Sequence, residues 1–446
     1  MINKVLKLQK KTVQNEMISH LRNLVRINTT NPPGNERKAA RYIADVFKKE
    51  GISFRVLESA PKRANLVARI PGNGNLRPLL LMGHLDVVGV EEDMWDHPPF
   101  DAVLSQGFVW GRGTLDCKNS VALWMMIMIL VKRSGAVFDR DLIFLATADE
   151  EEGHTFGMEW ICKNHYDLID AEAALNEGGG FALDIFGKPC YTIQNAEKGN
   201  IWMQITARGE AGHASVPRKH NPAARITELA AKLARTRFPV KGTETVKEML
   251  RILSLSQNRL EGHILRSLTS PLFSNLILSM AVRDEELSSN LNALIRNTIC
   301  PTAVHGGDKI NVIPSEATLK IDCRILPGYD IERMEKVIRG IIGNDFDTEV
   351  LDARQPSESP VEHELAVSAE KALNAVKPGS VLIPLMSPGV TDACLLRPRG
   401  MAVYGFTPLL PGDNISLAHG NNERISVDSI RFSLDVGLRT VLDYIS

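Results

Sequence analysis

The stretch Leu79–Val90, LLLMGHLDVVGV, places a histidine and an aspartate at the end of an otherwise apolar segment. Its leucines predict a β-strand buried on both faces, and such a strand is normally apolar throughout. Residues i and i+2 of a strand point to one face, so we expect His84 and Asp86 to project side by side. The pair suits a catalytic acid–base element, a metal-bound histidine oriented by a carboxylate, or a core histidine satisfied by an acid. The stretch alone leaves all three open.

Acidic residues end two further apolar segments and precede a predicted helix. Asp149, Glu150 and Glu151 follow DLIFLAT, Glu177 follows AALN, and Asp116 lies just before a helical run. In an open α/β sheet, functional groups collect beyond the carboxyl ends of the strands. Three consecutive acids repel one another, so a solvated loop is one explanation and a bound cation is the better one.

These side chains indicate which cation would bind. Histidine and carboxylate ligands with no cysteine among them suit a borderline-to-hard divalent ion, for which Zn²⁺ fits best and Co²⁺ or Mn²⁺ are alternatives. The acids are too numerous for one tetrahedral ion. We therefore expect two ions that share a bridging carboxylate.

The order of the predicted elements indicates an α/β protein with an insertion. Over residues 1–198, apolar strand-like runs alternate with helices, as in a largely parallel sheet. Over 199–354, strands alternate polar and apolar residues, which predicts a smaller inserted α+β domain. Residues 355–446 return to helices and short apolar strands that would complete the first sheet.

Composition narrows the class of protein. The net charge of −1, with Lys and Arg spread along the chain, does not support binding to nucleic acid or to a membrane surface. The longest apolar run, Val121–Val131, has 11 residues, against the ~20 that span a bilayer, and predicts a buried helix. The six cysteines lack disulfide-like spacing and the N-terminus lacks a signal-peptide core. We expect a cytoplasmic protein with reduced thiols.

A resemblance to a known family becomes specific at this point. The motifs that carry it, in chain order, are INTTNPPGNE, GHLDVV, GRGTLDCKNS, ADEEEG, NEGGG, GEAGHASVP, GGDKINVIP with IDCRILPG, GVTDA and AHGNNE. They resemble the co-catalytic zinc hydrolases of peptidase clan MH, which include aminoacylase, carboxypeptidase S and succinyl-diaminopimelate desuccinylase. The resemblance implies an α/β catalytic domain of the zinc-hydrolase type, interrupted by an α+β lid or dimerisation domain.

The resemblance also implies roles for individual residues. The implied ligands are His84, Asp116 and Glu177 for the first metal and Asp116, Glu151 and His419 for the second, so that Asp116 bridges. Asp86 matches the acid that orients His84, and Glu150 matches the general base. A carboxylate beside an acidified water would remove its proton during attack on an amide carbonyl. We interpret Cys117 as tolerated variation rather than as a nucleophile.

Further residues match weaker parts of the family pattern. His213 resembles a histidine that reaches the active site of a neighbouring subunit and stabilises the oxyanion; an ordinary turn histidine is the alternative. Asn311 and Arg324 resemble contacts to the substrate's carbonyl or carboxylate. Thr391 and Asp392 resemble a loop that lines the pocket. The resemblance thus predicts a homodimer formed through the inserted domain.

The predicted function is metal-dependent hydrolysis of an amide or peptide bond adjacent to a free carboxylate. The substrates expected are N-acyl amino acids or short peptides, because the long segment between GHASVP and INVIP looks most like the aminoacylase and carboxypeptidase S branch. A biosynthetic deacetylase or desuccinylase is the alternative within the family. A non-catalytic metal-binding relative is the alternative outside it, and the presence of Glu150 and every matched ligand disfavours it.

Overall fold

The computed structural model describes the chain except for residues 186, 187, 256, 258 and 281–284. The chain divides into two compact units. The first contains residues 1–195, 359–385 and 391–446, and the second contains 196–358 and 386–390. The insertion predicted from the sequence, 199–354, falls within the second unit.

The main sheet has ten strands in the order β1-β2-β6-β3-β7-β18-β9-β16, with β8 and β17 also paired to β9. The central strands β6, β3, β7 and β18 pair in parallel, whereas β1–β2, β2–β6, β18–β9, β8–β9 and β16–β9 are antiparallel. The largely parallel α/β sheet predicted from the sequence is confirmed. The strands are β1 (Ser53–Ala60), β2 (Arg63–Ile70), β3 (Leu76–His84), β6 (Arg140–Thr147), β7 (Ala173–Asn176), β8 (Ala182–Ile185), β9 (Lys188–Glu197), β16 (Ser357–Glu358), β17 (Val381–Ser387) and β18 (Ala402–Gly405).

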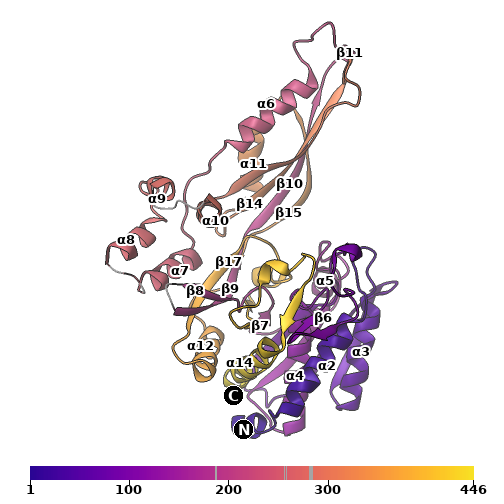
Figure 1. Ribbon diagram of the computed structural model, residues 1–446, viewed down its shortest axis with the longest axis vertical. Coiled ribbons are helices and arrows are strands. Elements are labelled where there is room, and N and C mark those ends of the chain that lie inside the picture. Colours follow the sequence, from indigo (N-terminus) through magenta and orange to yellow (C-terminus); the bar gives the residue numbers. More distant parts are fainter. Residues whose placement is uncertain (186–187, 256, 258, 281–284) are drawn as a thin grey trace. The chain divides into compact units, whose positions relative to one another are not determined.

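Helices cover both faces of this sheet (Figure 1). Along β3, Leu79 and Leu81 belong to one hydrophobic cluster and Leu80 and Met82 to another, as expected for a strand buried on both faces. The first cluster includes residues of α2, α3, α4, α12 and α14, and the second includes residues of α5 and α13. The helices of the first unit are α1 (Ile2–Leu6), α2 (Lys11–Val25), α3 (Glu36–Lys49), α4 (Lys118–Ser134), α5 (Met158–Asn164), α12 (Glu364–Val376), α13 (Ala393–Leu396) and α14 (Val427–Ile445).

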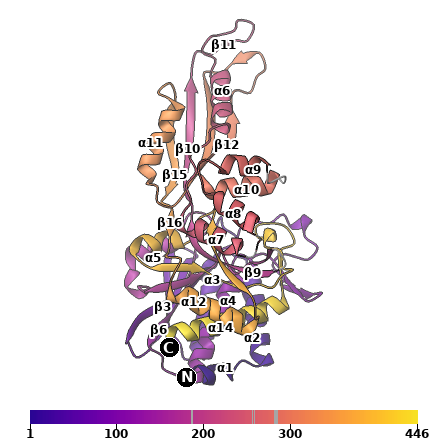
Figure 2. The same ribbon diagram turned by 90° about the vertical axis from the view of Figure 1, so that its left-hand side faces the viewer.

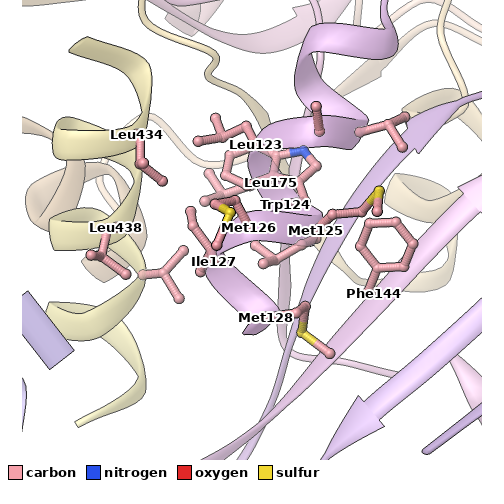
Figure 3. Packing of buried hydrophobic residues seen from close by; sticks show 14 of the residues in the cluster. Leu123, Trp124, Met125, Met126, Ile127, Met128, Phe144, Leu175, Leu434 and Leu438 are labelled. Atoms are coloured by element: carbon pink, nitrogen blue, oxygen red, sulfur yellow. The ribbon is translucent and has the colours of Figure 1, made fainter. Parts of the chain in front are cut away.

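Helix α4 is the apolar run that the sequence predicts to be a buried helix, and it is buried along its whole middle. Figure 3 shows Leu434 and Leu438 of α14 on one side of it and Phe144 of β6 on the other. Trp124 donates from Nε1 to the carbonyl O of Met82 (3.0 Å), which ties α4 to β3. No helix among the described residues combines the length and apolar character needed to cross a bilayer.

The second unit contains a four-stranded antiparallel sheet in the order β12-β14-β10-β15. Alternate residues of β14, among them Ile321, Cys323 and Ile325, are buried in a core shared with α6 and α11, and those helices lie along the sheet (Figure 2). This alternation of buried and exposed residues along the strands is the pattern from which the sequence predicts an α+β domain here. The elements are β10 (Gly199–Arg208), β11 (Gly212–His213), α6 (Pro222–Ala234), α7 (Glu244–Ser254), α8 (Arg259–Ser267), α9 (Ser274–Met280), α10 (Glu285–Ile295), β12 (Thr298–His305), β13 (Val312–Ile313), β14 (Glu316–Ile325), α11 (Ile331–Ile342) and β15 (Asp347–Arg354).

Two residues that flank the insertion are hydrogen-bonded to each other within the first unit. Ser359 N donates to Asn195 O (2.7 Å), and Asn195 Nδ2 donates to Ser359 O (3.1 Å). The chain therefore leaves and re-enters the first unit at neighbouring points.

The packing of α14 leads to a stability prediction. Leu438 is fully buried, so Leu438→Ala should lower the free energy of unfolding by about 2–5 kcal/mol through lost burial and the cavity left behind. Leu104 is 49% exposed, so Leu104→Ala should change it by no more than about 0.5 kcal/mol. Urea denaturation followed by circular dichroism measures both, and equal shifts in the two variants would contradict this account of the core.

Candidate metal centre

The predicted metal ligands of the first unit come together at one edge of the main sheet. His84 is the last residue of β3, Glu151 follows β6, and Glu177 follows β7. Because these three strands are mutually parallel, their carboxyl ends lie at the same edge. Asp116 lies just before α4, and His419 lies near the C-terminal end of the chain.

Asp116 lies between two histidines. Its Oδ1 is 3.0 Å from His84 Nε2, and its Oδ2 is 3.0 Å from His419 Nε2. His84 Nε2 is also 3.2 Å from Glu177 Oε2, and His419 Nε2 is 3.1 Å from Glu151 Oε2. Each oxygen of Asp116 thus faces a separate histidine–carboxylate pair.

The donor atoms form two sets, each within 4.8 Å, that could each hold a metal ion. One set comprises His84, Asp116, Cys117 and Glu177, and the other comprises Asp116, Glu151 and His419. The residues fit divalent cations, because nitrogen and carboxylate oxygen donors converge and Glu151 Oε1 is buried with no hydrogen-bond partner in the described chain. Cys117 adds a neighbouring sulfur to the first set, although its Sγ also accepts a hydrogen bond from His84 N (3.2 Å).

Electrostatics at the centre also favour a cation. Burial and the carboxylate of Glu177 raise the pKa of Glu150 well above its ordinary value, and burial raises the pKa of Glu177 to about 7. Hydrogen bonds to Asp116 and Glu151 raise the pKa of His419 to about 10. Against the effect of burial, hydrogen bonds from His419 and His84 lower the pKa of Asp116, whereas the crowded glutamates have raised pKa values, so negative charge accumulates here that a metal ion would offset.

Asp86 occupies a different place from the one expected. Strand β3 ends at His84, so Asp86 lies beyond the strand, with its Oδ1 3.5 Å from His84 Nδ1. The Nδ1–H of His84 donates instead to the carbonyl O of Asp86 (3.0 Å), which leaves Nε2 facing Asp116 and Glu177.

The carboxylate of Asp86 holds the turn after β6. It accepts hydrogen bonds from the backbone N of Glu150 at Oδ1 and from the backbone N of Glu151 at Oδ2, both at 3.1 Å. Asn31 Nδ2 also donates to its Oδ2 (2.9 Å). Burial would raise the pKa of Asp86, but the nearby imidazole of His84 and the hydrogen bonds from Asn31 and from the backbone N of Glu150 lower it below the ordinary value. Asp86 therefore orients three of the predicted site residues at once.

A buried network around Arg63 was missed by sequence reasoning. Asp149, which has a left-handed φ of 63°, accepts from Asn31 Nδ2 (2.9 Å) and from Arg63 Nη2 (2.7 Å). Arg63 Nε lies 2.8 Å from Glu36 Oε2. The motif INTTNPPGNE contains both Asn31 and Glu36, and its mixture of polar residues and prolines was the available signal.

A second buried pair, also missed, positions the segments that contain Asp116 and His419. Glu423 is fully buried and accepts from Arg112 Nη1 (2.6 Å) and from the backbone N of Gly113, Leu115 and Asp116 (3.0, 2.6 and 3.2 Å). Arg112 Nη2 also donates to His419 O (3.2 Å). The same region continues as a three-stranded sheet of β4 (Val103–Ser105), β5 (Phe108–Trp110) and β19 (Arg424–Ser426).

The glycines after Glu177 serve close packing. A Cβ added at Gly405 would lie 2.0 Å from the carbonyl O of Glu177, and one at Gly179 would lie 2.1 Å from the carbonyl O of Gly405. The main chain of NEGGG therefore lies directly against β18. This contact fixes the backbone of Glu177 behind the cluster.

Three predicted site residues lie in the second unit. His213 is exposed in β11, and its Nδ1 is 2.7 Å from Ser215 Oγ. Asn311 is exposed, and its carbonyl O accepts from Ala214 N (2.9 Å). Arg324 makes two contacts with Asp322, at 2.8 and 2.9 Å.

Thr391 and Asp392 lie in the first unit, immediately before α13. Asp392 is buried and Thr391 is partly buried. Their hydrogen bonds go to the ends of β6 and β7, as described below.

Relatives with known names share much of the sequence. The chain is 29% identical over 402 residues to a human N-fatty-acyl-amino acid synthase/hydrolase, PM20D1, which covers 87% of this chain and 78% of the relative. It is 27% identical over 446 residues to a probable succinyl-diaminopimelate desuccinylase of Staphylococcus aureus, covering 97% of this chain and 98% of the relative.

Solved structures share the fold. An M20 family metallo-carboxypeptidase from Sulfolobus solfataricus, Sso-CP2, superimposes with a TM-score of 0.75 at 19% identity, covering 96% of this chain and 99% of that one. Human carnosine dipeptidase 1 gives a TM-score of 0.69 at 17% identity, with 99% of each chain covered.

The sequence profile of peptidase family M20/M25/M40 matches residues 80–443. The match extends from β3, which ends at His84, to α14, beyond His419, and so spans every residue of both donor sets. The chain therefore belongs to peptidase family M20/M25/M40 and is a hydrolase of the metallopeptidase type.

Proposed function

We propose that the protein hydrolyses the amide bond of N-acyl amino acids or dipeptides, next to a free carboxylate, with two divalent ions, most favourably Zn²⁺. The observation that carries the proposal is the pair of donor sets that share Asp116, with the carboxylate of Glu150 beside them. His84, Asp116 and Glu177 would hold one ion, and Asp116, Glu151 and His419 the other. Such ions would polarise the amide carbonyl and acidify the attacking water.

Glu150 is the residue proposed to move protons. Its Oε2 lies 4.0 Å from His84 Nε2, it belongs to neither donor set, and its backbone N is fixed by Asp86. The carboxylate takes a proton from the attacking water as the new C–O bond forms. It then gives that proton to the amide nitrogen as the C–N bond breaks, so that the products are a carboxylic acid and an amine.

The substrate class rests on the named relatives. One acts, by its name, on N-fatty-acyl amino acids and one is a probable succinyl-diaminopimelate desuccinylase. Both reactions join or cleave an amide on an amino acid. Because the desuccinylase matches nearly the full length of both chains, N-succinyl-diaminopimelate is the second candidate substrate.

A metal-reconstituted substrate screen tests the function. We expect turnover of N-acyl amino acids or dipeptides that is abolished by chelation and restored by Zn²⁺ or Co²⁺. Asp116→Ala should reduce metal binding at both positions, because each donor set contains Asp116. Metal content measured by mass spectrometry accompanies the assay. Full activity in a rigorously metal-free sample would disprove the proposal, and turnover of N-succinyl-diaminopimelate alone would select the second candidate.

Adjacent glutamates provide a matched pair that separates base from ligand. Glu150→Ala should keep metal and lower kcat by about 10²–10⁴-fold, the range for a positioned general base. Glu151→Ala should instead lose metal affinity, because Glu151 Oε2 faces His419. Titration calorimetry with Zn²⁺ and steady-state kinetics measure the two effects. Near-normal turnover of Glu150→Ala would show that another group is the base.

Assembly forms a further part of the proposal. We infer a cytoplasmic homodimer joined through the second unit, in which His213 of each subunit stabilises the oxyanion in its partner. The exposure of His213 and its place in a motif outside the metal cluster support this role. The buried thiols of Cys117, Cys162 and Cys323 support a reducing compartment.

Mixing two inactive variants tests the role of His213. His213→Ala should lower kcat by ~10²–10³-fold, as loss of one oxyanion donor does. In a heterodimer with Glu150→Ala, one site carries both defects and the other is whole. Random exchange makes about half of the dimers mixed and so restores about a quarter of wild-type activity. If exchange is confirmed by mass spectrometry and activity does not return, His213 does not act across subunits.

A further inference from the structure

Thr391 and Asp392, which the resemblance predicts to line the substrate pocket, contact the ends of two strands. Asp392 is 1% exposed, and its Oδ2 accepts a hydrogen bond from Thr147 Oγ1 (2.7 Å). Its Oδ1 lies 2.9 Å from His154 Nδ1. Thr391 Oγ1 accepts from Asn176 Nδ2 (3.0 Å).

These contacts reach the segments that contain three of the proposed catalytic and metal-binding residues. Thr147 ends β6, and His154 lies in the turn 148–157 between β6 and α5, the turn that contains Glu150 and Glu151. Asn176 ends β7 and directly precedes Glu177. We propose that Thr391 and Asp392, with Thr147, His154 and Asn176, form a brace that positions these glutamates and does not contact the substrate.

Burial explains why Asp392 is unsuited to bind the substrate directly. Both of its oxygens already have a partner, and Thr147 and His154 are themselves buried. Because Asp392 is 1% exposed, a substrate group could reach the carboxylate only if the packing around it opened. Asp392 therefore acts through the turn, as a positioning residue.

The conformation of His154 links the brace to the turn backbone. Its φ of 68° lies in the left-handed region that non-glycine residues rarely adopt. Its N donates to Asp149 O (2.6 Å), and its O accepts from Gly157 N (3.1 Å) and Glu159 N (3.0 Å). The hydrogen bond that the imidazole donates to Asp392 holds His154 in place, and thus holds the far side of the turn.

A matched pair of substitutions at Thr147 tests the brace. Thr147→Val keeps the shape but removes the hydroxyl that Asp392 accepts from, whereas Thr147→Ser keeps the hydroxyl. We expect Thr147→Val to lower kcat by about 10- to 100-fold at a KM within about twofold of wild type, because misplaced catalytic groups lose rate rather than substrate affinity. Thr147→Ser should stay within about twofold of wild type in both constants.

Hydrogen exchange measured by mass spectrometry provides a readout independent of activity. The kinetic comparison of the Thr147 variants depends on the proposed function, whereas the exchange measurement requires no turnover of a substrate. Thr147→Val, His154→Ala and Asp392→Asn should each speed amide exchange in the turn 148–157 of the metal-loaded protein. Asp428→Ala is the control, because Asp428 is exposed on α14 and pairs with Arg431. Its exchange and kinetics should match wild type.

Three outcomes would overturn the brace. The first is a raised KM at unchanged kcat in Asp392→Asn, with His154→Ala unaffected, which would make Asp392 a substrate contact. The second is multiplicative losses in the double variant His154→Ala/Asp392→Asn, because residues that act through one bond are non-additive. The third is unchanged exchange in the turn. If the wild type cleaves none of the substrates, the proposed function fails while the exchange result still decides the brace.

Discussion

The buried carboxylate of Asp86 is the constraint on which the rest of the centre depends. The side chain of Asp86 accepts hydrogen bonds from the backbone N of Glu150 and of Glu151, and its main-chain carbonyl O accepts one from His84 Nδ1–H. Two proposed metal ligands, His84 and Glu151, and the proposed base, Glu150, are thus fixed relative to one another by a single residue. A buried carboxylate is stable only when hydrogen-bond donors surround its oxygens. The donors that stabilise Asp86 in the interior are therefore the same groups that Asp86 positions.

Around this residue, the protein concentrates negative charge and balances it with buried arginines. Arg63 lies between Glu36 and Asp149. Arg112 and backbone N–H groups of the GRGTLD loop hydrogen-bond the carboxylate of Glu423. Among the described residues, no arginine pairs with the carboxylates of the two donor sets, which agrees with the proposal that a cation balances their charge. The acids that pair with arginine are thus different from those proposed to bind metal.

The sequence was sufficient for those features that depend on local pattern. The apolar run ending in His84 and the buried helix over Val121–Val131 were both predicted, as was the convergence of acids at strand ends, because parallel strands end at one edge. The positions of Asn31, Arg63 and Glu423 depend on tertiary packing, and no local periodicity specifies them. Asp86 was expected within the strand because an i, i+2 spacing does not reveal where a strand ends. The roles of Asn311, Arg324 and His213 stay predictions.

The hydrogen-bonded pair Asn195 and Ser359 has a consequence for how such a chain can be altered. Ends that are already adjacent can be joined by a very short linker, so the segment 196–358 is attached as a module would be. Exchange of that segment between homologous chains would replace one edge of the main sheet, because Ser357 and Glu358 of β16 pair there with Glu197 and Ala196 of β9. The segment 386–390 also belongs to the second unit although it lies far along the chain, and its Met386 is buried in a core of that unit. A clean graft of the module therefore has to carry these five residues with it, as a second and separate insertion.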